Sequence, residues 1–279
     1  MSSVVIQGPA LNGASIQRLQ QLAGAAAPLV VSPTVVRLAG VPVPLRPELT
    51  DFARTERLDV TVVPRTLRAS EFRLLAMDMD STLITIECID EIADMVGVKA
   101  EVKKITEAAM RGEVDFAGAL RRRVALLAGL EVGALEQVYS ERLKLSPGAE
   151  DLLDFARRSG WRTLLVSGGF TFFTERLQAR LGLDFTLANL LEVEHGRLTG
   201  RVAGTIVDAD RKAAEVRRVC ELIGCPTSAA VVAGDGANDL KMMAEAGWSV
   251  AFRAKPVVQA QASMAINHNG LDAVIQVFE

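Results

Sequence analysis

The sequence predicts an α/β protein: a doubly wound parallel sheet with a helical cap inserted into it, and a small α/β domain at the amino terminus. Runs that are apolar on both faces alternate with helical patterns from residue 71 onward, which is typical of a parallel sheet covered by helices on both sides. The strand signal stops between about residues 88 and 146. The chain has 279 residues, 49% of them apolar, which is enough for two domains with cores of their own.

Residues 1–70 are predicted to form the small amino-terminal domain. Short apolar runs alternate there with amphipathic helical patterns; the runs lie at 4–8, 28–41 and 58–64, and the helices at 15–24 and 48–57. The segment holds no cluster of reactive side chains. Packing, or dimerisation of two copies through this domain, is therefore the favoured interpretation, and a regulatory, ligand-sensing role is the alternative.

Residues 71–279 are predicted to form the second domain, around strands at 73–77, 161–169 and 228–236. In doubly wound sheets ligands bind at the carboxyl ends of the strands, so the Gly, Ser and Asp residues at these ends are the candidates for chemistry. The region 88–146 is predicted to form a helical cap over that edge of the sheet. Its helical patterns lie at 89–97, 100–112, 115–130 and 133–144.

Composition excludes several classes of function. A net charge of −3 gives the chain no general attraction to nucleic acid or to an anionic membrane. The sequence shows neither a membrane span nor a signal peptide, so a cytoplasmic protein is expected. The cysteines Cys88, Cys220 and Cys225 form no disulfide or zinc pattern. The histidines His195 and His268 lie in turn-like stretches, so acid–base chemistry is expected to use carboxylates.

Four aspartates follow two of the predicted strands: Asp78, Asp80, Asp235 and Asp239. Asp78 and Asp80 are two residues apart in extended chain, so they project to the same side. A single aspartate there would be interpreted as a helix cap, but the second repels the first unless a cation or a proton intervenes. Carboxylate oxygens without histidine or thiol ligands select a hard cation. If the two strands are neighbours, the sequence predicts bound Mg²⁺.

A phosphate-binding turn is predicted at the end of the strand at 161–169. Ser167 offers a hydroxyl, and Gly168 and Gly169 let main-chain amides approach an anion closely. Lys212, placed after a predicted strand at 205–211 and at the start of a helix, can offset the negative charge of the site. Taken alone, a lysine is more often a solvated surface residue and Ser-Gly-Gly is a weak signal. Beside the aspartates, both indicate phosphate chemistry.

These motifs resemble those of a known family. DMDSTLI at 78–84, SGG at 167–169, Lys212 and GDGANDL at 234–240 occur in the order found in the haloacid dehalogenase-like phosphatases. The extended first motif and the helical segment after it further resemble the phosphoserine phosphatases of that superfamily. The resemblance covers about residues 71–279 and implies a Rossmann-like core with a cap.

The resemblance also implies a role for each matching residue. Asp78 would be the nucleophile that forms an aspartyl phosphate, and Asp80 the general acid that protonates the leaving oxygen and later activates water. Mg²⁺ would be held by Asp78, by the main-chain carbonyl of Asp80 and by Asp235. Ser167, Gly168 and Lys212 would bind the phosphoryl group, and Asn238 would help to position it. Asp239 would not bind the ion itself but would orient water and Lys212.

Substrate choice is implied to come from the cap. Glu87 would face the ammonium group of phosphoserine and Arg123 its carboxylate, which an arginine can hold with two hydrogen bonds. Met110 and Phe116 would line the pocket. Apart from the resemblance, Met110 and Phe116 are typical core residues of a helical cap, and the arginines at 121 and 122 are typical of a solvated helix face.

The implied activity is Mg²⁺-dependent hydrolysis of O-phospho-L-serine to L-serine and phosphate, the last step of serine biosynthesis. A phosphotransferase that passes the same phosphoryl group to another small alcohol is one alternative. A phospho-accepting signalling receiver is another, because it also uses aspartates, Mg²⁺, a hydroxyl and a lysine on a parallel sheet; it needs neither a cap nor an acid at Asp80. A regulator with a decayed enzyme domain is disfavoured, because every catalytic position is filled.

Overall fold

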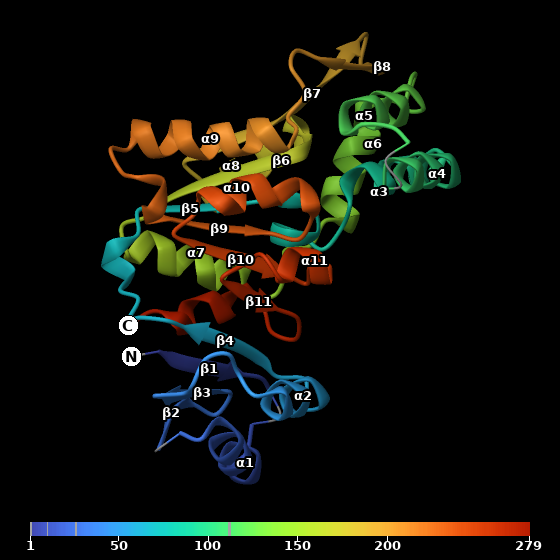
Figure 1. Ribbon diagram of the computed structural model, residues 1–279. Helices are drawn as coiled ribbons and strands as arrows, with labels where there is room; N and C mark the ends of the chain where they lie inside the picture. Colours follow the sequence, from blue (N-terminus) through green and yellow to red (C-terminus); the bar gives the residue numbers. More distant parts are fainter. Residues whose placement is uncertain (1, 10, 26, 111–112) are drawn as a thin grey trace. The chain divides into compact units, whose positions relative to one another are not determined.

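The computed structural model describes residues 2–9, 11–25, 27–110 and 113–279, with only the main chain described at Met110 (Figure 1). The chain divides into two compact units. The first consists of Met1–Leu75, Pro147–Arg162 and Cys225–Glu279, and the second of Ala76–Ser146 and Thr163–Gly224. Among the described residues, no helix combines the length and the hydropathy that crossing a bilayer requires.

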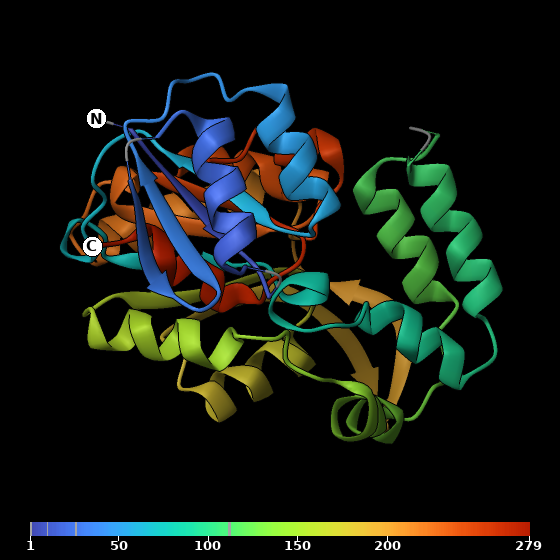
Figure 2. The same ribbon diagram turned by 90° about the horizontal axis from the view of Figure 1, so that it is seen from below.

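The amino-terminal part of the first unit is a four-stranded antiparallel sheet in the order β2-β3-β1-β4. Its strands are β1 (Ser3–Gln7), β2 (Pro28–Ser32), β3 (Val35–Ala39) and β4 (Asp59–Val63). The apolar stretch predicted at 28–41 is thus a hairpin of two strands. Helices α1 (Gly13–Ala23) and α2 (Pro47–Thr55) lie on one face of the sheet (Figure 2).

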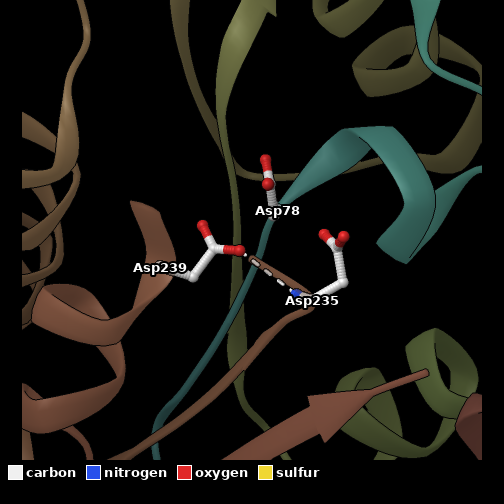
Figure 3. A group of neighbouring side chains, drawn as sticks. All are labelled: Asp78, Asp235 and Asp239. Carbon is white, nitrogen blue, oxygen red and sulfur yellow. Dashed lines mark hydrogen bonds between the residues drawn. The ribbon is translucent and has the colours of Figure 1, made fainter. Parts of the chain in front are cut away.

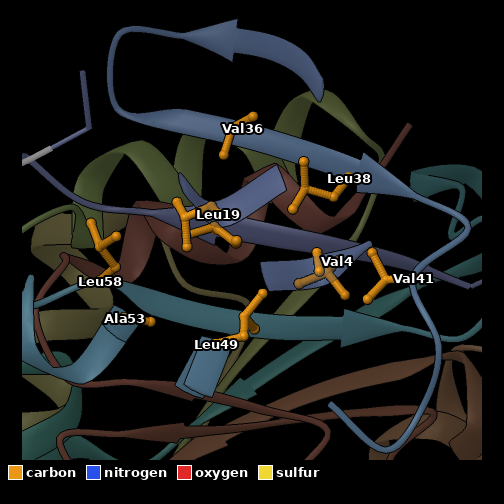
Figure 4. Packing of buried hydrophobic residues seen from close by; sticks show 10 residues of the cluster. Val4, Leu19, Val36, Leu38, Val41, Leu49, Ala53 and Leu58 are labelled. Carbon is orange, nitrogen blue, oxygen red and sulfur yellow. The ribbon is translucent and has the colours of Figure 1, made fainter. Parts of the chain in front are cut away.

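Local sequence explains where these two helices begin and end. The side chain of Asn12 accepts hydrogen bonds from the main-chain amides of Ala14 and Ser15, which caps α1, and Gly24 ends it in the left-handed region at a φ of 66°. Pro47 stands in the first turn of α2, where its missing N–H costs nothing. Both helices bury apolar side chains against the sheet; Figure 4 shows the cluster around Val4, Leu19, Leu38 and Leu49.

A buried carboxylate ties this small sheet to the rest of the first unit. Asp59, at the start of β4, is 3% exposed. Its oxygens accept hydrogen bonds from the main-chain amides of Asn267, His268 and Asn269, and from the side-chain amide of Asn269 at 2.7 Å. Because a buried charge is costly unless donors surround it, these bonds fix the loop that follows β11 against β4.

The other strands of the first unit are parallel: β9 (Ala230–Gly234), β10 (Trp248–Phe252) and β11 (Met264–Ile266). Every residue of β9 and β10 is buried, as expected for strands covered on both faces. Helices α7 (Ala149–Arg158), α10 (Leu240–Glu245) and α11 (Pro256–Gln259) belong to this unit.

A seven-stranded sheet has the order β11-β10-β9-β5-β6-β7-β8, in which the observed pairs of β9 with β10, β10 with β11 and β6 with β7 are parallel. Strands β5 (Leu74–Met77), β6 (Arg162–Phe170) and β7 (Phe185–Glu194) are followed by β8 (Arg197–Ala203), which forms an antiparallel hairpin with β7. His195 lies in the turn between β7 and β8, as the sequence predicts. The predicted α/β class with a mostly parallel sheet is confirmed.

Helices of the second unit fall into two groups. Helices α8 (Thr171–Leu181) and α9 (Ala209–Leu222) follow strands. Four other described helices lie between β5 and α7. Among them, α4 and α5 lie side by side (Figure 2). Helix α5 also packs against β8. These four are α3 (Cys88–Met95), α4 (Lys99–Met110), α5 (Phe116–Ala125) and α6 (Val132–Gln137).

The strand predicted at 205–211 is wrong. Residues 204–208 form a bend and irregular chain, and α9 begins at Ala209. The main-chain amide of Val207 donates to the side-chain oxygen of Asn189 at 2.8 Å, instead of to a neighbouring strand. The amide of Val207 is therefore bonded to a side-chain acceptor, and not to the neighbouring strand that the apolar pattern predicts.

Candidate active site

Asp78 lies directly after the buried strand β5 and is itself 5% exposed. Its Oδ1 accepts two hydrogen bonds, from the main-chain amide of Met79 at 2.7 Å and from Nζ of Lys212 at 2.8 Å. The chain then makes a tight turn in which Ser81 has a φ of 56°, a left-handed conformation that is uncommon for a residue with a side chain. Strand, amide and lysine together hold the carboxylate in one orientation.

Lys212 is a buried residue of the first turn of α9, with 1% of its surface exposed. The helix begins there because the side chain of Asp208 caps it by accepting from the amide of Arg211. A buried ammonium requires a counter-charge, and Asp78 supplies one. The surface position that is usual for a lone lysine is therefore excluded here.

The predicted phosphate-binding turn lies within the end of β6, where the pairing with β7 shifts register between Val166 and Phe170. Oγ of Ser167, which is fully buried, accepts a hydrogen bond from the amide of Gly169 at 2.8 Å. Neither glycine has room for a side chain: a Cβ on Gly168 would lie 2.9 Å from Cζ of Phe116, and one on Gly169 would lie 2.8 Å from Oδ2 of Asp80. The two glycines thus let Phe116 and Asp80 approach the main chain of this turn.

Asn189, which the sequence analysis missed, supports the same turn. It is 1% exposed on β7, and its side chain donates to the carbonyl of Gly168 at 2.8 Å while accepting from the amide of Val207. It therefore connects the end of β6 with the segment that leads to Lys212. The only signal in the sequence is one polar residue within a mainly apolar strand, which does not reveal its partners.

Asp80 is a half-buried acid whose Oδ1 accepts from the amide of Cys88 at 3.1 Å. Burial, followed by the charge of Glu87, raises the pKa of Asp80 to about 7, while hydrogen bonds from Cys88 and the positive charge of Lys212 oppose the rise. A carboxyl group with such a pKa exists in both protonation states near neutral pH. It has the property that a group serving as both acid and base needs.

Glu87 and Arg123, the predicted specificity pair, lie in the same unit as Asp80. Oε1 of Glu87 accepts from Oγ of Ser81 at 2.6 Å. Arg123 is half-buried; burial lowers its pKa, whereas the charges of Asp90, Glu87 and Asp80 raise it. Its guanidinium group is therefore within electrostatic reach of these acids.

The structure also describes most of the other residues singled out in the predicted cap. Arginines 121 and 122 are exposed, as expected of a solvated helix face. Phe116 is half-buried and faces Gly168, so it is not a fully buried core residue. The side chain of Met110 lies outside the described residues, so its predicted place in the pocket stays a prediction.

Asp235 and Asp239 follow β9. Oδ2 of Asp239, which is fully buried, accepts from the amides of Asp235 and Gly236 at 3.1 and 3.0 Å, and Asn238 donates to its Oδ1 at 3.3 Å. One carboxylate oxygen each from Asp78, Asp235 and Asp239 lie within 4.8 Å of one another (Figure 3).

This donor set fits a hard cation, because it contains only oxygen and brings together charges that would otherwise repel. The family resemblance implies an orienting role for Asp239. Its carboxylate lies with the other two, although main-chain amides already bond to one of its oxygens. The side chain of Asp80 is not part of the cluster, and the predicted use of its main-chain carbonyl stays a prediction.

The sequence profile of the haloacid dehalogenase-like hydrolases matches residues 75–244, more than half of the chain. The chain belongs to the haloacid dehalogenase-like hydrolase family. The family resemblance of the motifs is thereby confirmed, and the matched segment runs from β5 to α10 and contains Asp78, Asp80, Asp235 and Asp239.

Three proteins similar to this haloacid dehalogenase-like hydrolase are phosphoserine phosphatases by name. The phosphoserine phosphatase of Polaromonas sp. is 51% identical over 225 residues, which are 79% of this chain and 95% of that protein. The crystal structure of a probable phosphoserine phosphatase from Vibrio cholerae is 36% identical, covers 99% of this chain and 85% of that chain, and has a TM-score of 0.86. A phospho-aspartyl intermediate analogue of phosphoserine phosphatase is also 36% identical, covers 75% of this chain and 99% of that chain, and has a TM-score of 0.70.

Proposed function

We propose that the chain hydrolyses O-phospho-L-serine to L-serine and inorganic phosphate, the last step of serine biosynthesis. The observation that carries the proposal is the presence of an acidic side chain, Glu87, and a cationic one, Arg123, within electrostatic reach of each other and of Asp80 in the second unit. A zwitterionic amino acid presents one ammonium and one carboxylate, so these two side chains complement it. The names of the relatives above support the same substrate.

In the proposed first step the carboxylate of Asp78 attacks phosphorus. A bond forms between phosphorus and the aspartate oxygen as the bond from phosphorus to the serine oxygen breaks, and the serine oxygen keeps the electron pair and takes a proton from Asp80. Lys212 and the turn at Ser167 neutralise the phosphoryl oxygens, so that one anion can approach another. The solved phospho-aspartyl analogue of a similar protein supports this route.

In the second step Asp80, now a carboxylate, takes a proton from water while the water oxygen bonds to phosphorus. The bond between phosphorus and Asp78 breaks, which returns the Asp78 carboxylate and releases phosphate. One carboxyl group serves as acid and then as base, and a pKa near 7 suits both tasks.

A divalent cation, Mg²⁺ in our proposal, would be held by Asp78, Asp235 and the main-chain carbonyl of Asp80, and would supply positive charge to the phosphoryl oxygens. Asp239 would keep its main-chain bonds and orient Asp235. Asn238, bonded to Asp239, would help to position the phosphoryl group.

The proposed substrate is tested by a steady-state comparison of phosphoserine, phosphothreonine and p-nitrophenyl phosphate. We expect kcat/KM to be highest for phosphoserine, with one phosphate released for each serine. Equal values for phosphoserine and the aryl ester would contradict the proposal. The same assay with homoserine present separates the alternative, because a phosphotransferase would form phosphohomoserine in place of part of the free phosphate.

Removal of the cation should stop catalysis. We expect excess chelator to abolish phosphate release and added Mg²⁺ to restore it, because a divalent cation would offset the combined charge of the three neighbouring aspartates. At 100 times its Kd, Mg²⁺ should also stabilise the protein by about 2.7 kcal/mol. Thermal unfolding should show this gain in the wild type and in a variant of an exposed acid, Asp51→Asn, but not in Asp235→Asn. Full activity in excess chelator would refute the assignment.

Arg123→Ala should raise KM for phosphoserine by about 100-fold, because a charged hydrogen-bonded pair with the substrate carboxylate is lost. The aryl ester has no such carboxylate, so its KM should change far less. Arg122→Ala, on the exposed face of the same helix, is the matched control and should leave both substrates unaffected. An equal loss on both esters would move substrate specificity to other residues.

A further inference from the structure

Gly200 lies inside β8, although a glycine within a strand weakens it. Its φ of 82° is in the left-handed region, and the pairing of β7 with β8 shifts register between the pairs that bracket it. The surroundings of Gly200 add a second requirement. A Cβ at this position would lie 2.9 Å from Cβ of Ala128 and 3.3 Å from the main chain of Ala125. The missing side chain therefore lets β8 pack directly on the end of α5 (Figure 1).

Hydrogen bonds hold the same hairpin to the chain that follows α5. The main-chain amide of Gly129 donates to the carbonyl of Leu198 at 2.8 Å, and the amide of Leu198 donates to the carbonyl of Leu130 at 2.8 Å. Nη1 of Arg197 also donates to the carbonyl of Gly129 at 2.8 Å. Because these bonds would have to lengthen or break if the two segments moved apart, the hairpin fixes this end of α5.

Both ends of α5 are thus held within the second unit. At its start, Phe116 lies against Gly168, since a Cβ on that glycine would be 2.9 Å from Cζ of the ring. At its end lies β8. Arg123 belongs to the last turn of the helix, two residues before Ala125, and its Nε donates to the carbonyl of Ala119 at 3.4 Å. A shift of this end of α5 therefore moves the main chain that carries the guanidinium group.

We propose that Gly200 is a positioning residue for substrate recognition, which places Arg123 for the substrate carboxylate by letting β8 contact α5. This inference rests on the proposed role of Arg123. Two parallel hydrogen bonds from a guanidinium group require exact geometry, and a displacement of about 1 Å can cost on the order of 100-fold. Rotation of a side chain cannot make room for a Cβ at position 200, because Cβ of Ala128 is attached directly to the main chain. The main chain must shift instead.

The simpler interpretation is that Gly200 serves only the left-handed backbone of β8. Gly196, in the turn of the same hairpin, separates the two interpretations, because its φ is 77°. Among the described residues other than its chain neighbours, none has an atom within 4 Å of a Cβ built there. Alanine strains the backbone at either position, but only at position 200 does it meet the end of α5.

The experiment compares KM and kcat for phosphoserine and for p-nitrophenyl phosphate, in saturating Mg²⁺, for the wild type, Gly200→Ala and Gly196→Ala. We expect Gly200→Ala to raise KM for phosphoserine by about tenfold, with little change in kcat. KM for the aryl ester, which has no carboxylate, should change far less. Gly196→Ala should leave both KM values close to those of the wild type. Adding Ala128→Gly to Gly200→Ala removes the nearest atom and should lower KM for phosphoserine again.

Three results would overturn the positioning role: equal rises in KM for both esters, equal effects of the substitutions at positions 196 and 200, or no recovery with Ala128→Gly. If Gly200→Ala does not fold, Gly200→Asn and Gly196→Asn give the same comparison, because asparagine tolerates a positive φ better than alanine does.

Arg123→Ala separates this failure from that of the proposed function. If Arg123→Ala weakened both esters equally, the proposed recognition of the substrate carboxylate would be wrong, and the role of Gly200 would fall with it. If Arg123→Ala acted selectively on phosphoserine and Gly200→Ala did not, the error would lie in the role of Gly200 alone.

Discussion

Asp78→Asn is expected to abolish phosphate release, with a loss of about 10⁵-fold or more in kcat, because a carboxamide cannot attack phosphorus and no covalent intermediate can form. The substitution preserves shape, and its amide oxygen can still accept from the amide of Met79. The fold should therefore persist, but with lower stability, because Lys212 loses its charged partner. The measurement is phosphate release in a single turnover, with circular dichroism and thermal unfolding as controls.

The covalent intermediate should also be detectable directly in the wild type. Wild-type protein quenched with acid during turnover of phosphoserine should carry a phosphoryl group on the peptide that contains Asp78, and Asp78→Asn should not. Substantial turnover by the variant, or a phosphoryl group on another residue, would remove the covalent mechanism proposed here.

Lys212→Met should affect both activity and stability. The ammonium lies 2.8 Å from Oδ1 of Asp78, and its side chain is 1% exposed, so its removal leaves a buried carboxylate without a cation. Breaking such a pair costs about 3–5 kcal/mol, and loss of a charge that stabilises the transition state lowers kcat by about 10³-fold. Urea unfolding in metal-free buffer measures the first effect, and phosphate release in saturating Mg²⁺ the second.

Two further variants make this prediction specific. Arg211→Met removes a cation from the preceding, exposed position of the same helix and should change little. Asp78→Asn combined with Lys212→Met should recover part of the stability lost in the single lysine variant, because no buried charge is then unpaired. A single variant as stable as the wild type would show that water or another group compensates Asp78.

The parts of the site that the sequence predicts are those written in contiguous motifs at strand ends. Strands β5, β6 and β9 are buried on both faces, so their apolar runs are unambiguous, and the polar residues that follow them fall at the carboxyl edge of the sheet by geometry alone. Asp78 and Asp235 follow this rule, whereas Ser167 lies near the end of the apolar run, still inside β6.

The residues that the sequence does not predict as functional act through main-chain atoms distant in the chain. Asn189 bonds to the carbonyl of Gly168 and to the amide of Val207. The main-chain amide of Cys88 donates a hydrogen bond to the side chain of Asp80. Neither forms a pattern with its sequence neighbours. The strand wrongly predicted before Lys212 is a further example. Its apolar residues give no indication that the main-chain amide of Val207 bonds to the distant side chain of Asn189.

The single carboxylate of Asp59 sets a condition for anyone who wishes to shorten this protein. A version cut after β4 would leave three consecutive amides, at residues 267–269, facing water without the acceptor that now organises them, and would uncover the flank of β11. A designed minimal hydrolase would need a replacement acid at that point, supplied by a new side chain or a bound anion.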